Sequence, residues 1–532
     1  MSWPHWIMLP IVLPLMTGAL LTVLGQRAVR WQAWLSGLSA AAGLGIALLL
    51  LQQADTGAVQ AYLVGNWAAP FGISLALDRL AAMMVVLTSL VGLAAHIYAT
   101  GGDSARGRHF HALLQFQLMG LNGAFLTADL FNLFVFFEVL LIASYGLLLH
   151  GGGTARLKAA VHYVSFNLAG SALFLIAVSL LYGLTGTLNM ADLAQRLPLL
   201  PPDRSQLIQV AALLLLVVFS VKAALLPLYF WLPATYGAAS APVAAFFAIM
   251  TKVGVYAILR VTTLIFGADA GAAAMVASPW LPGLALATLF LGAVGAVSAP
   301  NLRALVGNVV VASAGTLLLA VGLAQADTIA AGLFYLVNST VVAAAVFLLA
   351  DQILVARARY APGEPSQLWE AVPMGAARVP LGILFFVLAA ASAGLPPLAG
   401  FLGKALLLQA ALATPWANAV VAVVLGSSFL MLIAFSRAGS LLFWKTSSSH
   451  TSLTQHPWHW ETGHLVSLVG LLAVVLACAV GAGPLARYTA QTADQLLQPQ
   501  SYRDAVLGAR PVPAAWDVRQ ELRERLEAGG KK

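Results

Sequence analysis

The chain has 532 residues, of which 61% are hydrophobic and 9% are charged, and its formal net charge is +8. Soluble domains carry about 25% charged residues, so this chain could not cover a globule with polar surface, and a soluble enzyme or a nucleic-acid-binding protein is excluded. The single cysteine, Cys478, lies in an apolar run and supports neither a disulfide framework nor a metal site.

Apolar segments long enough to cross a hydrocarbon core as helices, about 20 residues each, recur along nearly the whole sequence. They predict an all-α, polytopic membrane protein with about fourteen transmembrane helices. In chain order the predicted spans are residues 7–25, 32–51, 77–98, 111–127, 130–149, 160–184, 207–230, 241–266, 282–299, 303–323, 329–350, 380–412, 416–444 and 464–487.

The loops between these spans predict the orientation of the chain. Lys and Arg concentrate in alternate loops, and cytoplasmic loops carry the excess of basic residues. The rich set is Arg27, Arg30, Arg106, Arg108, Arg156, Lys158, Arg303, Arg357, Arg359, Arg378, Arg437 and Lys445; the poor set is Arg79, Arg196, Arg204 and Arg260. This distribution predicts that both termini lie on the outer side of the membrane.

Two of the spans contain helix-breaking sequences. Leu225 to Pro227, followed by Pro233, interrupts the seventh span, and Gly394 to Pro397 interrupts the twelfth. Broken helices at membrane depth survive only where protein or a water-filled cavity satisfies the freed backbone groups. Paired broken helices are typical of transporters with inverted repeats, although two ordinary proline kinks would give the same local pattern.

The two breaks lie five spans apart and therefore divide the chain into units. We predict N-terminal helices 1 to 3 (1–110), a first five-helix repeat (111–266), an inverted second repeat (282–444), a last helix (464–487) and a charged C-terminal tail (488–532). A short charged surface helix is expected in this tail, over residues 514–528.

Four ionisable residues fall well inside predicted spans: Glu138, Lys222, Lys252 and Lys404. Each costs at least about 2.5–3.5 kcal/mol at the centre of a membrane helix, so each should face protein or water, and the default interpretation is an ion path. At 1.5 Å per residue, Glu138 and Lys252 lie about 12 and 16 Å into their spans, near mid-depth.

A buried ammonium group releases its proton more readily because desolvation disfavours the charged form, and a nearby carboxylate reverses that effect. We therefore expect Glu138 and Lys222 to form a switchable pair, Lys252 to relay protons, and Lys404 to be the terminal site. Static ion pairs that only fix helix packing are the alternative.

Several further residues are weaker candidates for the proton path. Asp129 lies nine residues before Glu138 and is expected mainly to cap the outer end of its span. His162 could pass protons inward. Residues that could line a hydrated path are Asn132, Asn167, Ser220, Thr251 and Asn338, although hydrogen bonds between helices explain such residues equally well.

The most distinctive stretches of the sequence are residues 131–140 (FNLFVFFEVL), 221–233 (VKAALLPLYFWLP), 241–260 and 394–404 (GLPPLAGFLGK). Over about residues 75 to 445, the chain resembles the antiporter-like subunit family shared by Mrp-type cation/proton antiporters, the membrane arm of respiratory complex I and membrane-bound hydrogenases. The resemblance implies fourteen spans, broken helices seven and twelve, and proton transfer by Glu138, Lys222, Lys252 and Lys404.

Within this family, residues 141–147 (LIASYGL), residues 186–193 (GTLNMADL) and Lys404 resemble the shorter of the two large subunits of Mrp-type antiporters. That likeness implies a proton-translocating subunit of a multisubunit Na⁺ or K⁺/H⁺ antiporter in the bacterial inner membrane. The implied partners are a larger homologous subunit and several small membrane subunits.

A proton-pumping membrane-arm subunit of a complex I-like NADH:quinone oxidoreductase or membrane-bound hydrogenase is the alternative. The sequence has no cysteine cluster, dinucleotide glycine motif or haem-like histidine pair, so no cofactor is expected. This does not separate the two functions, because redox centres would lie on other subunits. A scaffold whose charges only pack helices is the third possibility.

Overall fold

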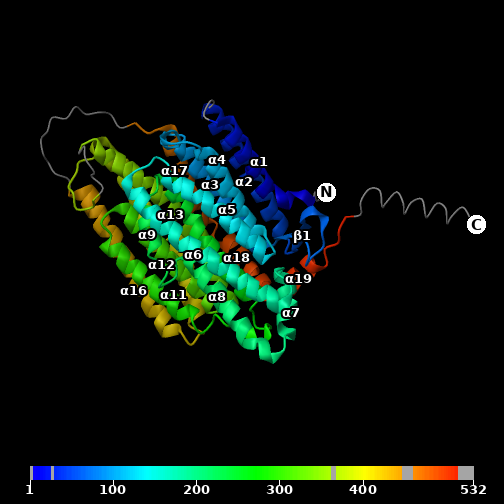
Figure 1. Cartoon of the computed structure of the whole chain (residues 1–532). Helices are drawn as coiled ribbons and strands as arrows, with labels where there is room; N and C mark the ends of the chain where they lie inside the picture. The colour runs from blue at the N-terminus through cyan, green and yellow to red at the C-terminus, as the bar shows by residue number, and fades with distance from the viewer. Residues whose placement is uncertain (1–3, 26–28, 361–366, 446–458, 513–532) are drawn as a thin grey trace, which may run out of the picture.

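The computed structural model describes residues 4–25, 29–360, 367–445 and 459–512, and nearly all of them are helical (Figure 1). The α-helices are α1 (Leu9–Leu24), α2 (Val29–Ala54), α3 (Arg79–Ala99), α4 (Phe110–Leu126), α5 (Leu130–Leu149), α6 (Thr154–Thr185), α7 (Met190–Arg196), α8 (Ser205–Ala223), α9 (Trp231–Ala238), α10 (Ala241–Leu264), α11 (Leu281–Ser298), α12 (Leu302–Gly322), α13 (Ala326–Ala358), α14 (Arg378–Ala393), α15 (Ala399–Ala411), α16 (Ala417–Gly439), α17 (Thr462–Val480), α18 (Ala482–Leu497) and α19 (Gln500–Leu507). The all-α, polytopic fold predicted from the apolar periodicity is confirmed.

Within the described residues, thirteen helices are long and apolar enough to cross a membrane. They coincide with thirteen of the predicted spans. The helix α4, with 17 residues, occupies the position of the remaining predicted span and packs against α1, α3 and α5.

The bundle has a buried centre and lipid-facing edges. Helices α10 and α13 are buried along their whole apolar length, whereas less than a third of that length is buried in α2 and α17. Figure 1 shows α1 and α2 along one edge of the bundle and α16 along the opposite edge. A polar side chain on α10 or α13 therefore meets other helices and not lipid.

The first predicted break separates α8 from α9. The segment between them starts at Ala224, which has a left-handed conformation (φ 56°). Protein groups satisfy the freed backbone: the Leu225 amide donates to the Ser220 carbonyl at 3.0 Å, and the Trp231 Nε1 donates to the Val221 carbonyl at 3.1 Å. The helix is thus interrupted where the prolines predict, and protein groups bond to the backbone at the break.

The second predicted break separates α14 from α15. It begins at Gly394, whose φ of 81° favours glycine because this residue lacks a Cβ. The Leu395 amide donates to the Ala390 carbonyl at 2.9 Å, and the carbonyl of Ala393 accepts a hydrogen bond from Lys404. Lys404 is therefore part of the structure that stabilises the break.

Some short elements were not predicted from the sequence. The strands β1 (Gln60–Leu63) and β2 (Ser74–Leu77) pair antiparallel, with Gln60 opposite Leu77. The helix α18 runs past residue 487, where the last predicted span ends, and α19 packs against α7 and both strands. The helix expected at residues 514–528 lies outside the described residues.

Candidate functional site

Glu138 lies on α5, and its carboxylate is only partly buried. Asp129 starts this helix by accepting a hydrogen bond from the Asn132 amide at 2.8 Å, so the capping interpretation of Asp129 is confirmed. The Glu138 carboxylate accepts a hydrogen bond from Ser171 Oγ on α6. A neutral hydroxyl, and not a cation, is thus its hydrogen-bond partner.

Lys222 lies one residue before the end of α8, directly before the first break, and is 5% exposed. Its Nζ donates to Asn167 Oδ1 on α6 at 3.1 Å and stands 5.8 Å from the centroid of the Phe137 ring. Within the described residues Lys222 and Glu138 are not within ion-pair distance of each other, so the direct pair expected from the sequence is replaced by two contacts on α6.

Lys252 lies in the middle of α10 and is fully buried. Its Nζ donates to Ser313 Oγ on α12 at 3.0 Å. Two residues further along α10, Gly254 packs on the end of α8 so closely that an added Cβ would lie 2.4 Å from the Ala223 nitrogen. The helices that carry Lys222 and Lys252 are therefore in backbone contact beside the two lysines.

Lys404 lies on α15, directly after the second break, and is 9% exposed. Its Nζ donates to the Ala393 carbonyl at 2.9 Å and to Ser428 Oγ on α16 at 3.0 Å. Because Ala393 is the last residue of α14, the ammonium group also meets the negative end of that helix dipole.

None of these four side chains takes part in an ion pair among the described residues. The five ion pairs found there all join an arginine to an aspartate. Neutral hydroxyl, amide and carbonyl groups hold the three lysines instead. Such groups bind an ammonium group without the full opposite charge that a carboxylate would supply.

A small cavity lies between the Lys252 and Lys404 sites. Its lining includes Ser313, Tyr335, Asn338 and Ser392, and its volume of about 10 Å³ is the space of roughly one water molecule. Ser313 is the partner of Lys252, and Asn338 contacts α15 at Gly400, where an added Cβ would lie 3.0 Å from its Nδ2. Polar side chains thus extend from Lys252 toward the second break.

Of the other candidates, Asn132 and His162 lie away from the lysines, and Ser220 and Thr251 lie next to them in the chain. Asn132 belongs to the cap of α5, since its Nδ2 donates to Thr127 Oγ1. His162 is exposed on α6 and contacts the carbonyl of Lys158. Ser220 and Thr251 are buried neighbours of Lys222 and Lys252; the Ser220 carbonyl belongs to the first break, and the Thr251 hydroxyl bonds to its own helix.

The sequence did not reveal a second buried charged cluster. Arg260 on α10 forms a bidentate ion pair with Asp78, at 2.5 and 2.8 Å, and the exposed fractions of both residues are 3% or less. Asp78 also caps α3, and the rings of Tyr256 and Tyr502 lie against the guanidinium. The sequence analysis grouped Arg260 with the basic residues of loops, although it lies inside the predicted span 241–266. A charge inside a span was the signal that could have pointed to a buried partner.

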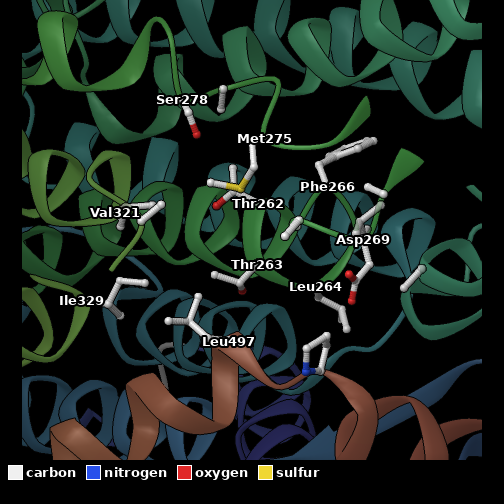
Figure 2. Close-up of a pocket in the computed structure, with 18 of the residues that line it drawn as sticks. Thr262, Thr263, Leu264, Phe266, Asp269, Met275, Ser278, Val321, Ile329 and Leu497 are labelled. Atoms are coloured by element: carbon white, nitrogen blue, oxygen red, sulfur yellow. The ribbon is translucent and has the colours of Figure 1, made fainter. Parts of the chain in front are cut away.

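Figure 2 shows a different cavity, formed beyond the end of α10 by residues 262–278 together with the α12–α13 turn and the α18–α19 segment. Its volume is about 160 Å³, and its ionisable lining residues are Asp269 and Arg503. Glu138 and the three lysines do not line it. This cavity is therefore separate from the candidate proton site.

Comparisons with known proteins identify the family of the chain. A family profile described as "NADH:quinone oxidoreductase/Mrp antiporter, TM" matches residues 127–430. A probable K⁺/H⁺ antiporter subunit of Rhizobium meliloti is 41% identical, over 95% of this chain and 98% of the relative. A Na⁺/H⁺ antiporter subunit of Bacillus subtilis is 34% identical, over 94% and 99% of the two chains.

The fold also matches a solved structure. A chain of the Mrp complex from Dietzia sp. superimposes with a TM-score of 0.82 at 28% identity, over 96% of this chain and all of that chain. The similarity thus extends beyond the matched family segment to both ends of the bundle.

Proposed function

We propose that this chain, which belongs to the family of Mrp-type antiporter subunits, translocates protons within a multisubunit antiporter that exchanges Na⁺ or K⁺ for H⁺. One of its relatives is described as a K⁺/H⁺ antiporter subunit and the other as a Na⁺/H⁺ antiporter subunit. The chain is accordingly part of a transporter and not an enzyme.

The observation that carries this proposal is the contrast between two kinds of buried charge. Arg260 is held by a bidentate carboxylate, as a structural ion pair would be. Lys222, Lys252 and Lys404 are held by Asn167, Ser313 and Ser428, which are neutral. A lysine in such surroundings can pass between its charged and neutral forms, which proton transfer requires.

The proposed path follows the contacts between these residues. A proton moves between Glu138 and Lys222 through the polar side of α6, where Ser171 and Asn167 meet them. From Lys222 it moves across the contact between α8 and α10 to Lys252. From Lys252 it passes Ser313 and the small cavity that Ser313 and Ser392 line, toward the second break and Lys404.

The proposal includes an inverted-repeat architecture. Helices α4 to α10 form the first repeat and α11 to α16 the second, each containing one broken helix. An odd number of spans per repeat inverts the second relative to the first. Both termini lie outside, and the loops that contain Arg106, Arg156 and Arg303 face the cytoplasm.

The proposed assembly contains a larger homologous subunit and several small membrane subunits in the bacterial inner membrane. The cation crosses elsewhere in this assembly, because a row of lysines repels Na⁺ and K⁺. The two relatives described above are antiporter subunits, and this chain matches nearly the whole length of each, which favours this assembly over a redox-driven pump.

The direct test is cation-dependent proton movement in everted membrane vesicles that contain the complete complex. In the wild type, addition of Na⁺ or K⁺ should dissipate the pH gradient across the vesicle membrane. Lys222→Ala, Lys252→Ala and Lys404→Ala should each abolish this dissipation. Lys158→Ala, which removes an exposed lysine from α6, should leave it intact. Full exchange in the variants of buried lysines, with the complex assembled, would refute the proposal.

Partner identification separates this function from the alternative. Tagged chain should be purified from mildly solubilised native membranes and its partners identified by mass spectrometry. Small membrane subunits without flavin or iron-sulfur proteins support the antiporter. Quinone-reducing or hydrogenase subunits would assign the same lysines to a redox-driven pump.

A further inference from the structure

A third and larger cavity, a cleft, opens at the end of the bundle where Arg106, Arg156, Arg303 and Arg357 lie. It has a volume of about 690 Å³, within the range of roughly 300–1,000 Å³ that is typical of ligand pockets. The first turns of α6 and α12, the last turn of α13 and Arg106 form its walls. Glu138 and the three lysines of the proposed proton path do not line it.

The ionisable residues in the lining are four arginines: Arg106, Arg156, Arg303 and Arg357. Asp103 pairs with Arg106, Asp351 pairs with Arg303, and Glu370 lies near Arg357, but none of these carboxylates lines the cleft. The carboxylates compensate part of this charge from outside the lining, while Arg106 and Arg303 still act unfavourably on the Arg156 guanidinium, so an anion in the cleft would be favoured.

Two of these arginines, Arg156 and Arg303, are oriented by protein contacts. Arg156 donates from Nε to the Ala238 carbonyl at 3.1 Å and from Nη1 to the His150 carbonyl. Arg303 donates from Nη2 to Asp351 at 2.5 Å, while its buried Nε has no hydrogen-bond partner within the described residues. The guanidinium groups are therefore held in place before any ligand arrives.

The backbone at the cleft also favours an anion. Gly151, Gly152 and Gly153 all have positive φ values, and they lead into α6, a helix of 32 residues. Gly153 is the N-cap residue and has no side chain to accept hydrogen bonds from the first amides of the helix. A helix start of this kind presents free N–H groups and the positive end of the helix dipole.

We propose that this cleft binds a phosphate-bearing anion. Guanidinium forks and helix-start amides together are the groups that recognise phosphate oxygens, and the cleft has room for more than one phosphate. The ligand is either a soluble polyphosphate or nucleotide, or the headgroup of an anionic phospholipid. This inference is independent of the proton path, because it uses none of its residues.

The test uses the chain in its native membrane assembly, purified in detergent, with inorganic pyrophosphate as the soluble probe. Ala155, an exposed residue of the lining, allows a substitution that keeps all four arginines. Ala155→Glu places a carboxylate in the cleft, and Ala155→Gln is the matched neutral control. Arg156→Gln removes one of the proposed contacts directly.

Calorimetric titration should show pyrophosphate binding to the wild type and to Ala155→Gln. Binding should be weaker by about tenfold or more in Ala155→Glu, since juxtaposed like charges are strongly unfavourable. Equal binding in Ala155→Glu and Ala155→Gln would place the ion elsewhere on the molecule and overturn the proposal.

The lipid source has its own readout. The purified assembly should be transferred to nanodiscs of phosphatidylglycerol or of phosphatidylcholine, and its retained phospholipid should be identified by native mass spectrometry. Retention of phosphatidylglycerol in Ala155→Gln but not in Ala155→Glu, without pyrophosphate binding, identifies a lipid headgroup. Absence of both differences overturns the proposal.

Discussion

Asn167 and Ser171 lie one helical turn apart on α6, and each binds a different member of the proposed proton path. Asn167 Oδ1 accepts a hydrogen bond from Lys222, and Ser171 donates one to Glu138. We expect the glutamate and the lysine to be coupled through this one face of α6. Both side chains bind to α6, and among the described residues they do not form a salt bridge with each other.

The substitution Asn167→Asp tests this coupling. A fixed carboxylate in contact with Lys222 holds the lysine in its charged form, so proton release should slow by about tenfold or more, because hydrogen bonds to charged groups contribute about 1.5–3 kcal/mol. Cation-dependent proton movement in everted vesicles measures the effect. Asn308→Asp is the matched control, since Asn308 bonds within α12. Wild-type rates in Asn167→Asp would argue against the coupling.

Gly394 supports Lys404 at the second break, and Gly394→Ala should disrupt that support. The residue has a φ of 81°, and an added Cβ would lie 3.1 Å from Lys404 Cδ and 3.2 Å from its Nζ. Transport should fall by about tenfold or more while the complex still assembles, because displacing a catalytic group by about 1 Å can cost two orders of magnitude.

The control for this substitution is Gly426→Ala, on the neighbouring helix α16. No described atom lies within 4 Å of its added Cβ, and replacing a helical glycine by alanine favours the helix by about 0.5–1 kcal/mol. Gly426→Ala should therefore transport normally and melt at the same temperature or slightly higher. If Gly394→Ala behaves in the same way, the glycine does not position Lys404.

The ion pair between Asp78 and Arg260 should behave as a structural element. Asp78→Asn leaves a buried guanidinium without its carboxylate, which should destabilise the chain by about 3–5 kcal/mol. The double variant Asp78→Leu/Arg260→Leu removes both charges and should be less destabilised. Thermal melting of the purified assembly measures both.

A pair whose arginine is about half exposed gives the comparison for this measurement. Arg196, whose side chain is 44% exposed, pairs with Asp192 at 2.9 Å. Arg196→Gln should destabilise the chain by less than Asp78→Asn does, because solvent reaches the Arg196 side chain and screens its charge. A similar effect of Asp78→Asn would mean that the buried pair contributes little.

The sequence predicts the helices and the breaks because both depend on local properties. Apolar runs of membrane length identify the spans, and the prolines at positions 227, 396 and 397 end the helices before them. The three lysines were identifiable because a charge inside an apolar run needs an explanation.

The partners of those lysines could not be predicted in the same way. Ser313 and Ser428 lie in apolar runs, where a serine usually bonds to its own helix, so nothing local marks them as partners of Lys252 and Lys404. The pairing of Asp78 with Arg260 joins residues that are 182 positions apart. Such contacts are set by how the helices pack and not by their local sequence.

His150, directly after α5, should make stability sensitive to acid. The residue is buried, its Nε2 lies 2.9 Å from the Asp103 carbonyl, and burial together with nearby Arg156 lowers its pKa, although Asp103 partly opposes this shift. A group whose pKa is lower in the folded state contributes stability that is lost as pH falls from about 6.5, its unfolded value, through the folded pKa.

The carboxyl of Asp103 acts in the opposite direction. Burial, reinforced by Asp351, raises its pKa, so its contribution to stability is present in acid and is lost as pH rises through the folded pKa. Between pH 7 and pH 5, His150→Gln should therefore reduce the fall in melting temperature of the purified assembly, and Asp103→Asn should increase it. Opposite pKa shifts require opposite changes in how steeply the melting temperature falls with pH. If the melting temperatures of both variants fall in parallel with that of the wild type, these two groups do not govern the acid response.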